Sequence, residues 1–466
     1  MNRGLWIAPA IGLVLYALPL AITPEAHGML GILGLTSVLW ITEALPLPVT
    51  AILAAVLVIL LGIGSASEVF GIFVDPLLFL FIGSFMLAEA MQVHGLDRRF
   101  AHAVLRNRWV RVSAGRMIFI YTFIAFFISM WVSNTATTAM LFPIGLSIVS
   151  VFSKEEKESV APLVLLMTSF AASIGGMATP VGTPPNLIGL GLLKEITGQS
   201  IRFATWMSFA LPISFITFLA IFLSMRLFLS HGVLGREIHE LPEEEPDARR
   251  RCGQRNVAIA FVITVFLWLL PSFAIFAGGD ADWWEARLPE SVAALIGTIL
   301  LFLLPINWKN REFTLTWKQA QNINWGIILL FGGGLVVGKF LFKTGVANYI
   351  GDTLSAVYPF SNEFMFILLF TLLAVFISEF TSNTASANLI LPICIAVSQA
   401  AGINPYKPAI AATLASSLGF MLPISTAPNA IVFGSGLIKL QTMIRYGLVL
   451  DVLGAVLVAV GVYWLA

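Results

Sequence analysis

The stretch SNTATTAMLFPI, Ser133 to Ile144, decides the fold, because a polar Ser-Asn-Thr run interrupts a long apolar segment. A second run, SNTASANLILPI, begins 249 residues later and covers Ser382 to Ile393. The apolar segments around them, 117–152 and 362–401, are each broken near the middle by the polar run. A polar turn in lipid would leave backbone N–H and C=O groups unsatisfied. We therefore predict two re-entrant hairpins whose tips are buried in protein at mid-membrane.

The composition of the whole chain also indicates a membrane protein. Of its 466 residues, 58% are hydrophobic and only 11% are charged, whereas soluble domains carry roughly 25% charged residues. The net charge of +1 offers no basic face for nucleic acid, and the two cysteines, Cys252 and Cys394, indicate neither a disulfide nor a metal site. The sequence predicts an all-α polytopic membrane protein, and transport is the function that this class favours.

Apolar runs long enough to cross a bilayer predict about 11 transmembrane helices in addition to the two hairpins. The predicted spans are 5–23, 29–45, 50–64, 76–94, 163–193, 204–229, 257–277, 290–306, 324–342, 406–437 and 444–465. We divide the chain into an N-terminal span (1–28), a first repeat (29–230), a cytoplasmic linker (231–256) and a second repeat (257–466).

The distribution of basic residues predicts the orientation. If the N-terminus is cytoplasmic and each hairpin returns to its own side, most of the 26 Lys and Arg residues fall in inside segments, and the outside loops are acidic. This asymmetry follows the positive-inside rule. We expect a multi-pass protein of the inner (plasma) membrane. The inside segments are 97–116, 153–158, 230–256, 307–323 and 438–445.

A second pair of polar segments repeats at a similar distance. SIGGMATPVGTPPNLI (Ser173 to Ile188) matches SLGFMLPISTAPNAI (Ser417 to Ile431) 243 residues apart, with Gly, Pro and Asn in register. Five spans separate the two hairpins, and an odd number means that the copies enter from opposite sides. Such inverted repeats bind substrate and ions at the midplane, where interrupted helices meet. Helix-to-helix contacts through small polar residues would explain one such motif, but two paired copies favour a binding site.

The residue types of these segments favour sodium coupling. Hydroxyl, amide and free carbonyl oxygens suit a hard cation, and helix N-termini suit an anion. Residues 117–152 contain no Lys, Arg or His, and 362–437 contain only Lys407. A bound dianion would therefore lack a cationic side chain, and an unpaired charge in a low dielectric is costly. Bound cations would compensate it, so symport is favoured over uniport.

Three carboxylates within or near spans are also candidates for function. Glu43 precedes Leu-Pro-Leu-Pro and suits an interfacial or structural role, and Glu89 suits either an ion pair or proton coupling. Glu379 lies four residues before Asn383, where tuning of the site is favoured over direct sodium ligation. No cluster of acids, bases or metal ligands indicates an enzyme.

The paired Ser-Asn-Thr runs, TPPN, TAPN and ITEALPLPVTA (Ile41 to Ala51) together resemble the divalent anion/sodium symporter family, INDY-type. The resemblance covers essentially the whole chain. It implies a homodimer with scaffold and transport domains in the lipid bilayer, an elevator movement, and Na⁺ symport of C4-dicarboxylates such as succinate.

The same resemblance implies the roles of individual residues. One sodium site would use Ser129, Ser133, Asn134 and Gly182, and the second would use Ser378, Ser382, Asn383 and the Ser425 carbonyl. The substrate would lie against Ser133, Asn134, Thr135, Thr183, Ser382, Asn383, Thr384 and Thr426. Ala427 replaces the proline found at Pro184 in the first copy, beside the substrate, and leaves the preferred acid open. Two alternatives stay open: a sodium-independent organic anion exchanger, and a transporter of inorganic anions such as sulfate.

Overall fold

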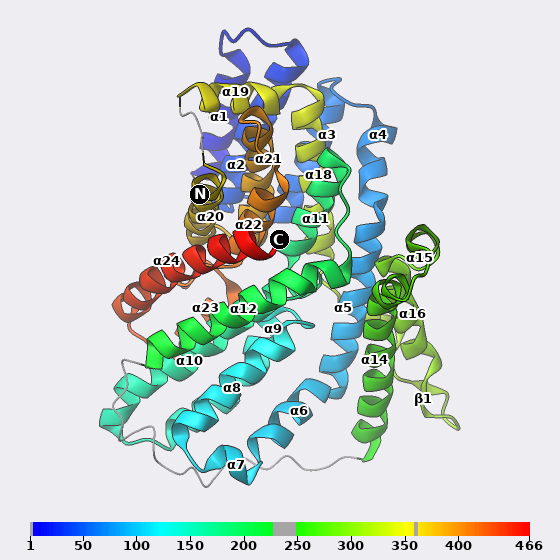
Figure 1. Cartoon of the computed structure of the whole chain (residues 1–466), viewed down its shortest axis with the longest axis vertical. Coiled ribbons are helices and arrows are strands. Elements are labelled where there is room, and N and C mark those ends of the chain that lie inside the picture. The colour runs from blue at the N-terminus through cyan, green and yellow to red at the C-terminus, as the bar shows by residue number, and fades with distance from the viewer. Residues whose placement is uncertain (1–2, 227–247, 358–361) are drawn as a thin grey trace.

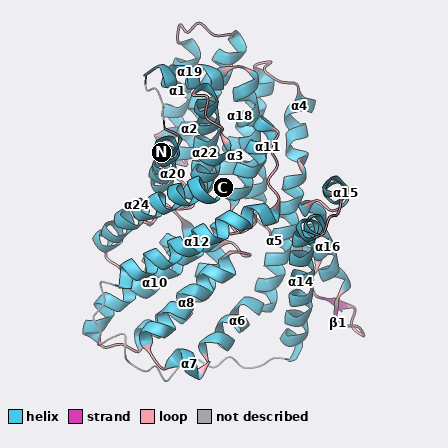
Figure 2. Ribbon diagram, viewed as in Figure 1, coloured by secondary structure: helices cyan, strands magenta, loops and turns pink. Residues whose placement is uncertain are grey.

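The computed structural model describes residues 3–226, 248–357 and 362–466. In the described part of the chain, helices account for nearly all the regular structure, and one short antiparallel strand pair, β1 (Pro305–Asn307) with β2 (Glu312–Phe313), projects at the edge (Figure 2). The fold class predicted from composition is therefore confirmed.

The described helices follow one another along the chain in two halves, separated by residues 227–247 (Figure 1). The first half comprises α1 (Gly4–Ala17), α2 (Pro24–Thr42), α3 (Leu47–Leu60), α4 (Ala66–Gly71), the 3-10 turn η1 (Ile72–Val74), α5 (Pro76–His94), α6 (Leu96–Leu105), α7 (Arg108–Arg111), α8 (Ala114–Ser129), α9 (Asn134–Ser150), α10 (Lys154–Met177), α11 (Pro184–Thr197) and α12 (Phe203–Arg226). The second comprises α14 (Ala248–Phe276), α15 (Ala281–Arg287), α16 (Glu290–Leu303), α17 (Trp317–Ala320), α18 (Trp325–Lys343), α19 (Val346–Val357), α20 (Glu363–Phe380), α21 (Asn383–Ala400), α22 (Tyr406–Ala415), α23 (Ala427–Phe433) and α24 (Leu440–Leu465).

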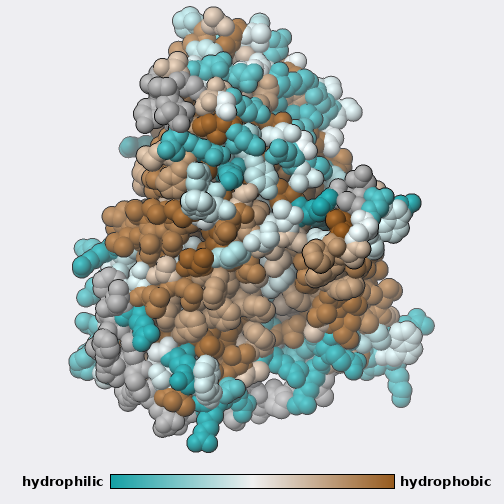
Figure 3. Space-filling view, in the orientation of Figure 1, coloured by the Kyte–Doolittle hydropathy of each residue, from teal (hydrophilic) through white to brown (hydrophobic). Residues whose placement is uncertain are grey.

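Long apolar helices give the molecule its membrane-spanning character. Among the described residues, seven helical segments are long and apolar enough to cross a bilayer, and α1, α3, α8 and α16 are shorter apolar helices. An apolar band crosses the middle of the surface, and polar residues gather toward the two ends of the long axis (Figure 3). The apolar stretch of α10 is entirely buried, which makes this helix the centre of the core.

Both predicted hairpins are pairs of helices joined by short turns. Helices α8 and α9 form the first and α20 and α21 the second, with their turns at residues 130–133 and 381–382. The amphipathic helices α6 and α19 precede them and lie toward opposite ends of the long axis (Figure 1). The predicted spans 163–193 and 406–437 each contain two helices, separated by a non-helical segment of turns and irregular chain at 178–183 and at 416–426, named the extended segment below.

The predicted linker, 231–256, falls mostly outside the described residues. Its last part, residues 248–256, forms the first turns of α14 rather than a linker. The apolar run that follows continues the same helix without a break.

Candidate substrate and sodium site

The two hairpin tips have the same side-chain geometry. Ser129 Oγ donates to Asn134 Oδ1 at 2.8 Å, and 249 residues later Ser378 Oγ donates to Asn383 Oδ1 at 2.9 Å. In each tip the serine before the asparagine caps the second helix: Ser133 accepts the Ala136 N–H and Ser382 accepts the Ala385 N–H. Capping satisfies one of the free N–H groups at a helix start.

The two extended segments are held by the asparagines of TPPN and TAPN. Asn186 Nδ2 donates to the carbonyls of Gly176 (2.9 Å) and Thr179 (2.7 Å). Asn429 Nδ2 donates to Gly419 (2.8 Å) and Leu422 (3.1 Å), at the same spacing along the chain. Gly176 lies in the last turn of α10, and the other three residues lie beyond a helix end, so no N–H four residues further on donates to these carbonyls as it would in a helix. Each asparagine therefore replaces hydrogen bonds that a continuous helix would make. The role of this pair was not anticipated from the sequence, although both asparagines were in register in the repeat.

Hairpins and extended segments are tied together directly. The Thr179 hydroxyl donates to the carbonyl of Met130 in the first hairpin turn. In the second half, Ser378 Oγ of the hairpin also donates to Ser416 O of the segment at 2.8 Å. Within that segment, Ser425 Oγ donates to Gly419 O at 2.8 Å. A Cβ at Gly176 would collide with Asn134 Oδ1. The close approach of the end of α10 to the first tip therefore requires glycine at this position.

The four segments surround one cavity of about 800 Å³. All but two of the predicted site residues line it. They are Ser133, Asn134, Thr135, Gly182, Thr183, Ser382, Asn383, Thr384, Ser425 and Thr426. The other two, Ser129 and Ser378, are fully buried behind the tips and reach the cavity wall through Asn134 and Asn383.

Four helices start at this cavity. Ser133, Thr183, Ser382 and Thr426 are the N-cap residues of α9, α11, α21 and α23, and all four line the cavity wall. The N-terminus of a helix carries partial positive charge and free N–H groups, which favour an anion. The described lining residues include no Lys, Arg or His. Backbone dipoles and hydroxyl groups are therefore the positive side of this site.

The opposite wall comes from residues that the sequence analysis did not assign to the site. Ser84 and Gln92 lie on α5, and Asn322 and Asn324 precede α18. They are single polar residues without a repeated motif, so the sequence carried no signal for them. Glu43 and Glu89 also line this wall, and Asn322 Nδ2 donates to Glu89 Oε1 at 3.5 Å. Glu43, expected to be interfacial or structural, ends α2 with a left-handed backbone (φ 45°).

Glu379 lies outside the cavity lining. Its two carboxyl oxygens accept the N–H groups of Met421 (2.8 Å) and Leu422 (3.1 Å) in the second extended segment. The carboxylate therefore contacts the segment behind the site, and its tuning of the site stays a prediction.

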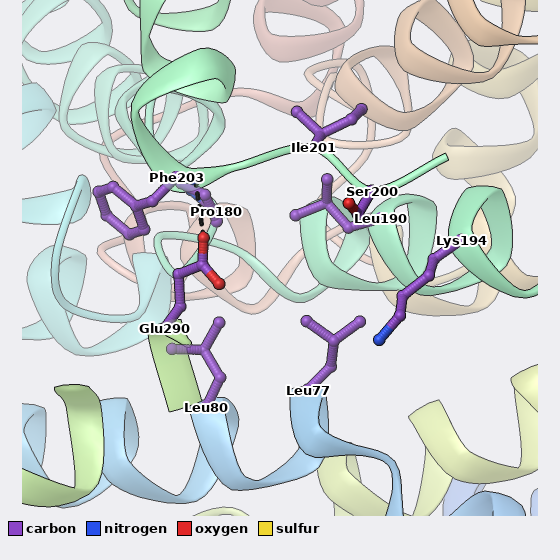
Figure 4. A pocket seen from close by; sticks show the side chains of 9 residues that line it. All are labelled: Leu77, Leu80, Pro180, Leu190, Lys194, Ser200, Ile201, Phe203 and Glu290. Carbon is purple, nitrogen blue, oxygen red and sulfur yellow. Dashed lines mark hydrogen bonds between the residues drawn. The ribbon is translucent and has the colours of Figure 1, made fainter. Parts of the chain in front are cut away.

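A second pocket, lined by Lys194 and Glu290, is too small to be the main site (Figure 4). Its volume is about 90 Å³, whereas ligand pockets usually occupy roughly 300–1,000 Å³. Glu290 Oε1 accepts the Phe203 N–H at 3.2 Å there. This carboxylate anchors the start of α12.

Comparisons with known proteins agree with this architecture. A family profile described as "Sodium:sulfate symporter transmembrane region" matches residues 2–466. The chain is 30% identical over 492 residues to a sodium-dependent dicarboxylate transporter, SdcS, of Staphylococcus saprophyticus, covering 100% of this chain and 92% of that protein. It is 32% identical over 449 residues to an uncharacterized transporter of Haemophilus influenzae, with coverage of 94% and 91%.

Two solved structures have a similar fold. The YdaH transporter of Alcanivorax borkumensis and MtrF of Neisseria gonorrhoeae each align with a TM-score of 0.55 and 16% identity, covering 86% and 88% of this chain and 88% and 84% of theirs. This likeness concerns the fold alone. Because the family profile spans almost every residue, the chain belongs to the sodium:sulfate symporter family of multi-pass, sodium-coupled membrane transporters.

Proposed function

We propose that this protein is a secondary-active symporter that moves C4-dicarboxylates, succinate among them, together with Na⁺. The observation that carries the proposal is the cavity in which four helix N-termini meet without a described cationic side chain. A dianion at that place interacts favourably with helix dipoles. Its remaining charge needs a mobile counter-ion, because uncompensated charge in a low dielectric is costly.

Each hairpin tip would hold one sodium ion. In the first, the oxygens of Ser129, Ser133, Asn134 and Gly182 supply hard ligands, and in the second Ser378, Ser382, Asn383 and the Ser425 carbonyl do so. The side-chain amide of Asn134 lies between the buried Ser129 and the cavity, and that of Asn383 lies between the buried Ser378 and the cavity. A carboxylate of the substrate would then contact the remaining hydroxyl and N–H groups. Those groups belong to Thr135, Thr183, Thr384 and Thr426 and to the pairs Ser133-Asn134 and Ser382-Asn383.

The proposal includes the movement and assembly of the transporter. The two hairpins, α10–α11 and α22–α23 are tied to one another by buried hydrogen bonds, and we propose that they move as one body past α5 and α18 in an elevator motion. The protein would act as a homodimer in the inner membrane with its N-terminus in the cytoplasm. It would transport its substrates without chemical change, as a transporter rather than an enzyme.

The names of relatives favour dicarboxylate over sulfate. SdcS of Staphylococcus saprophyticus and SdcS of Staphylococcus aureus (29% identical over 445 residues) are both sodium-dependent dicarboxylate transporters. Sulfate is the second candidate, because the family description names it. A cavity of about 800 Å³ has room for a four-carbon diacid and exceeds what a single inorganic anion needs.

The test is uptake of labelled succinate into proteoliposomes, with Na⁺ replaced by choline in the control. We expect uptake only with sodium, inhibition by unlabelled malate, and little inhibition by sulfate. Equal uptake in choline would overturn sodium coupling and favour an exchanger. If unlabelled sulfate strongly inhibited the uptake and malate did not, the substrate would be an inorganic anion instead of a dicarboxylate.

A further inference from the structure

A separate pocket of about 370 Å³ lies between the start of α8 and the end of α12. We name it the arginine pocket, because its charged side chains are Arg116 and Arg226. The described lining residues include no acidic side chain. Its apolar lining side chains are Phe119, Leu219, Phe222 and Leu223. The arginine pocket therefore combines positive charge with apolar surface, and it shares no lining residue with the substrate cavity.

The apolar walls of the arginine pocket come from both helices. On α12, Leu219, Phe222, Leu223 and Arg226 fall at positions i, i+3, i+4 and i+7, so they share one face of the helix. Phe119 of α8 packs edge-on against Phe222, with ring centroids 5.1 Å apart. Phe222 is 4% exposed, whereas Leu223 is 53% exposed. This face of α12 therefore leads from a packed wall to apolar surface that no described residue covers.

The apolar surface continues away from the arginines along both helices. Phe123 and Phe126 of α8 contact Phe215 and Phe218 of α12, with ring centroids between 5.2 and 6.3 Å apart. From the arginines to the far end of these rings is about 15 Å along either helix, at 1.5 Å per residue. That length is half of a hydrocarbon core about 30 Å thick. The rings therefore form an apolar track that matches the depth of one lipid leaflet.

The two arginines lie at the same end of this track. Arg116 is in the first turn of α8, and Arg226 is the last residue of α12. Arg116 Nη1 donates to the Trp109 carbonyl at 2.8 Å, and its guanidinium carbon lies 4.4 Å from the centroid of the Trp109 ring. Trp109 therefore holds the guanidinium in place, and because that group has five N–H donors, others remain for an anion. Tryptophan is also typical of the membrane–water interface, where lipid headgroups lie.

We propose that the arginine pocket binds an anionic phospholipid, with its phosphate beside Arg116 and Arg226 and an acyl chain along the aromatic track. Arginine suits phosphate, because its planar group offers paired N–H donors. Basic pockets between membrane helices bind anionic headgroups in this way. A free phosphate ion would leave the apolar walls unfilled, and a zwitterionic lipid would bring a cationic group toward the two arginines. The inference depends neither on the substrate nor on the coupling ion of the proposed function.

Arg226→Gln and Arg116→Gln test this assignment singly and together. Arg226 is exposed at the end of α12, so its replacement disturbs the fold least. The full-length protein in detergent is titrated with phosphatidylglycerol or phosphatidylcholine, and native mass spectrometry measures how much lipid is bound. We expect the wild type to bind phosphatidylglycerol more tightly than phosphatidylcholine. Each single change should weaken phosphatidylglycerol binding roughly fivefold, the effect of one basic residue near anionic lipid, and the double change should abolish the preference.

The matched control is Arg108→Gln, which removes the same charge from the exposed surface of the neighbouring helix α7, outside the arginine pocket. Thermal stabilisation by added lipid is the second readout, and glycerol phosphate supplies a headgroup without acyl chains. We expect phosphatidylglycerol to raise the Tm of the wild type and of Arg108→Gln, with a smaller rise in the two pocket variants and none with glycerol phosphate.

Three outcomes would overturn the inference. The first is equal binding of phosphatidylglycerol and phosphatidylcholine by the wild type, or an unchanged preference in the double variant. The second is an equal loss of phosphatidylglycerol binding in Arg108→Gln. The third is stabilisation by glycerol phosphate as large as that by the lipid, which would indicate an ion site. Because neither readout involves transport, failure of the proposed function would leave these results unchanged.

Discussion

At the scale of single residues, Asn134 and Asn383 connect the inside of each hairpin to the cavity. Each accepts a hydrogen bond from a fully buried serine, Ser129 or Ser378, and also lines the cavity. The amide is therefore held in one orientation by a group that solvent does not reach. Preorganised ligands of this kind lose little entropy when an ion binds.

Replacing either asparagine with alanine should stop coupled uptake. Each change removes a proposed sodium ligand. In the first tip it also leaves the buried Ser129 hydroxyl without the acceptor Asn134 Oδ1, at a cost of about 1–3 kcal/mol, whereas Ser378 keeps the Ser416 carbonyl as an acceptor. We expect sodium-dependent succinate uptake to fall at least about tenfold in Asn134→Ala and in Asn383→Ala. Gel filtration checks that each variant remains folded. Asn310→Ala, in the turn between β1 and β2, serves as the control; near-normal uptake in either tip variant would contradict the assigned site.

The sequence was most informative for residues that occur twice. The polar runs at Ser133 and Ser382 predicted the two tips, which contribute Ser-Asn-Thr residues to the cavity wall, because a repeated polar motif in an apolar chain has few structural explanations. The opposite wall was missed, because Ser84 and Asn324 come from distant segments that only the fold brings together.

At the scale of elements, the interrupted helices α10–α11 and α22–α23 depend on side chains that replace main-chain hydrogen bonds. Asn186 and Asn429 do this within each segment, and Thr179 ties the first segment to the hairpin turn at Met130. The sequence predicted the interruptions from Gly and Pro. It could not predict these hydrogen bonds, because their acceptors are backbone carbonyls whose positions depend on the folded chain.

Thr179→Val tests whether the tie between segment and hairpin stabilises the site. Valine has nearly the same shape but leaves the buried carbonyl of Met130 without this donor, which costs about 1–3 kcal/mol. We expect a lower Tm in detergent and reduced uptake. Thr353→Val is the matched control, since the Thr353 hydroxyl is exposed and bonds only to Tyr349 O of its own helix. Equal Tm values for the two variants would mean that the tie does not stabilise the site.

At the scale of the whole molecule, we propose that each hairpin enters from its own side of the membrane. Helices α6 and α7 lie at one end of the long axis and α19 at the other, beyond the apolar band (Figures 1 and 3). The end formed by α6 and α7 is rich in arginine, with Arg98, Arg99, Arg106, Arg108 and Arg111. By the positive-inside rule we propose that this end faces the cytoplasm. The second hairpin would then enter from the outside.

Single cysteines can test this orientation. Arg108 on α7 and Asp352 on α19 are both exposed, so a thiol at either position should react with a membrane-impermeant maleimide that reaches its side. The two native cysteines are first replaced, by Cys252→Ser and Cys394→Ala. In intact cells we expect labelling of Asp352→Cys and not of Arg108→Cys, and the reverse in inside-out vesicles. Labelling of both from one side would contradict the inverted arrangement, and reversed labelling would place the N-terminus outside.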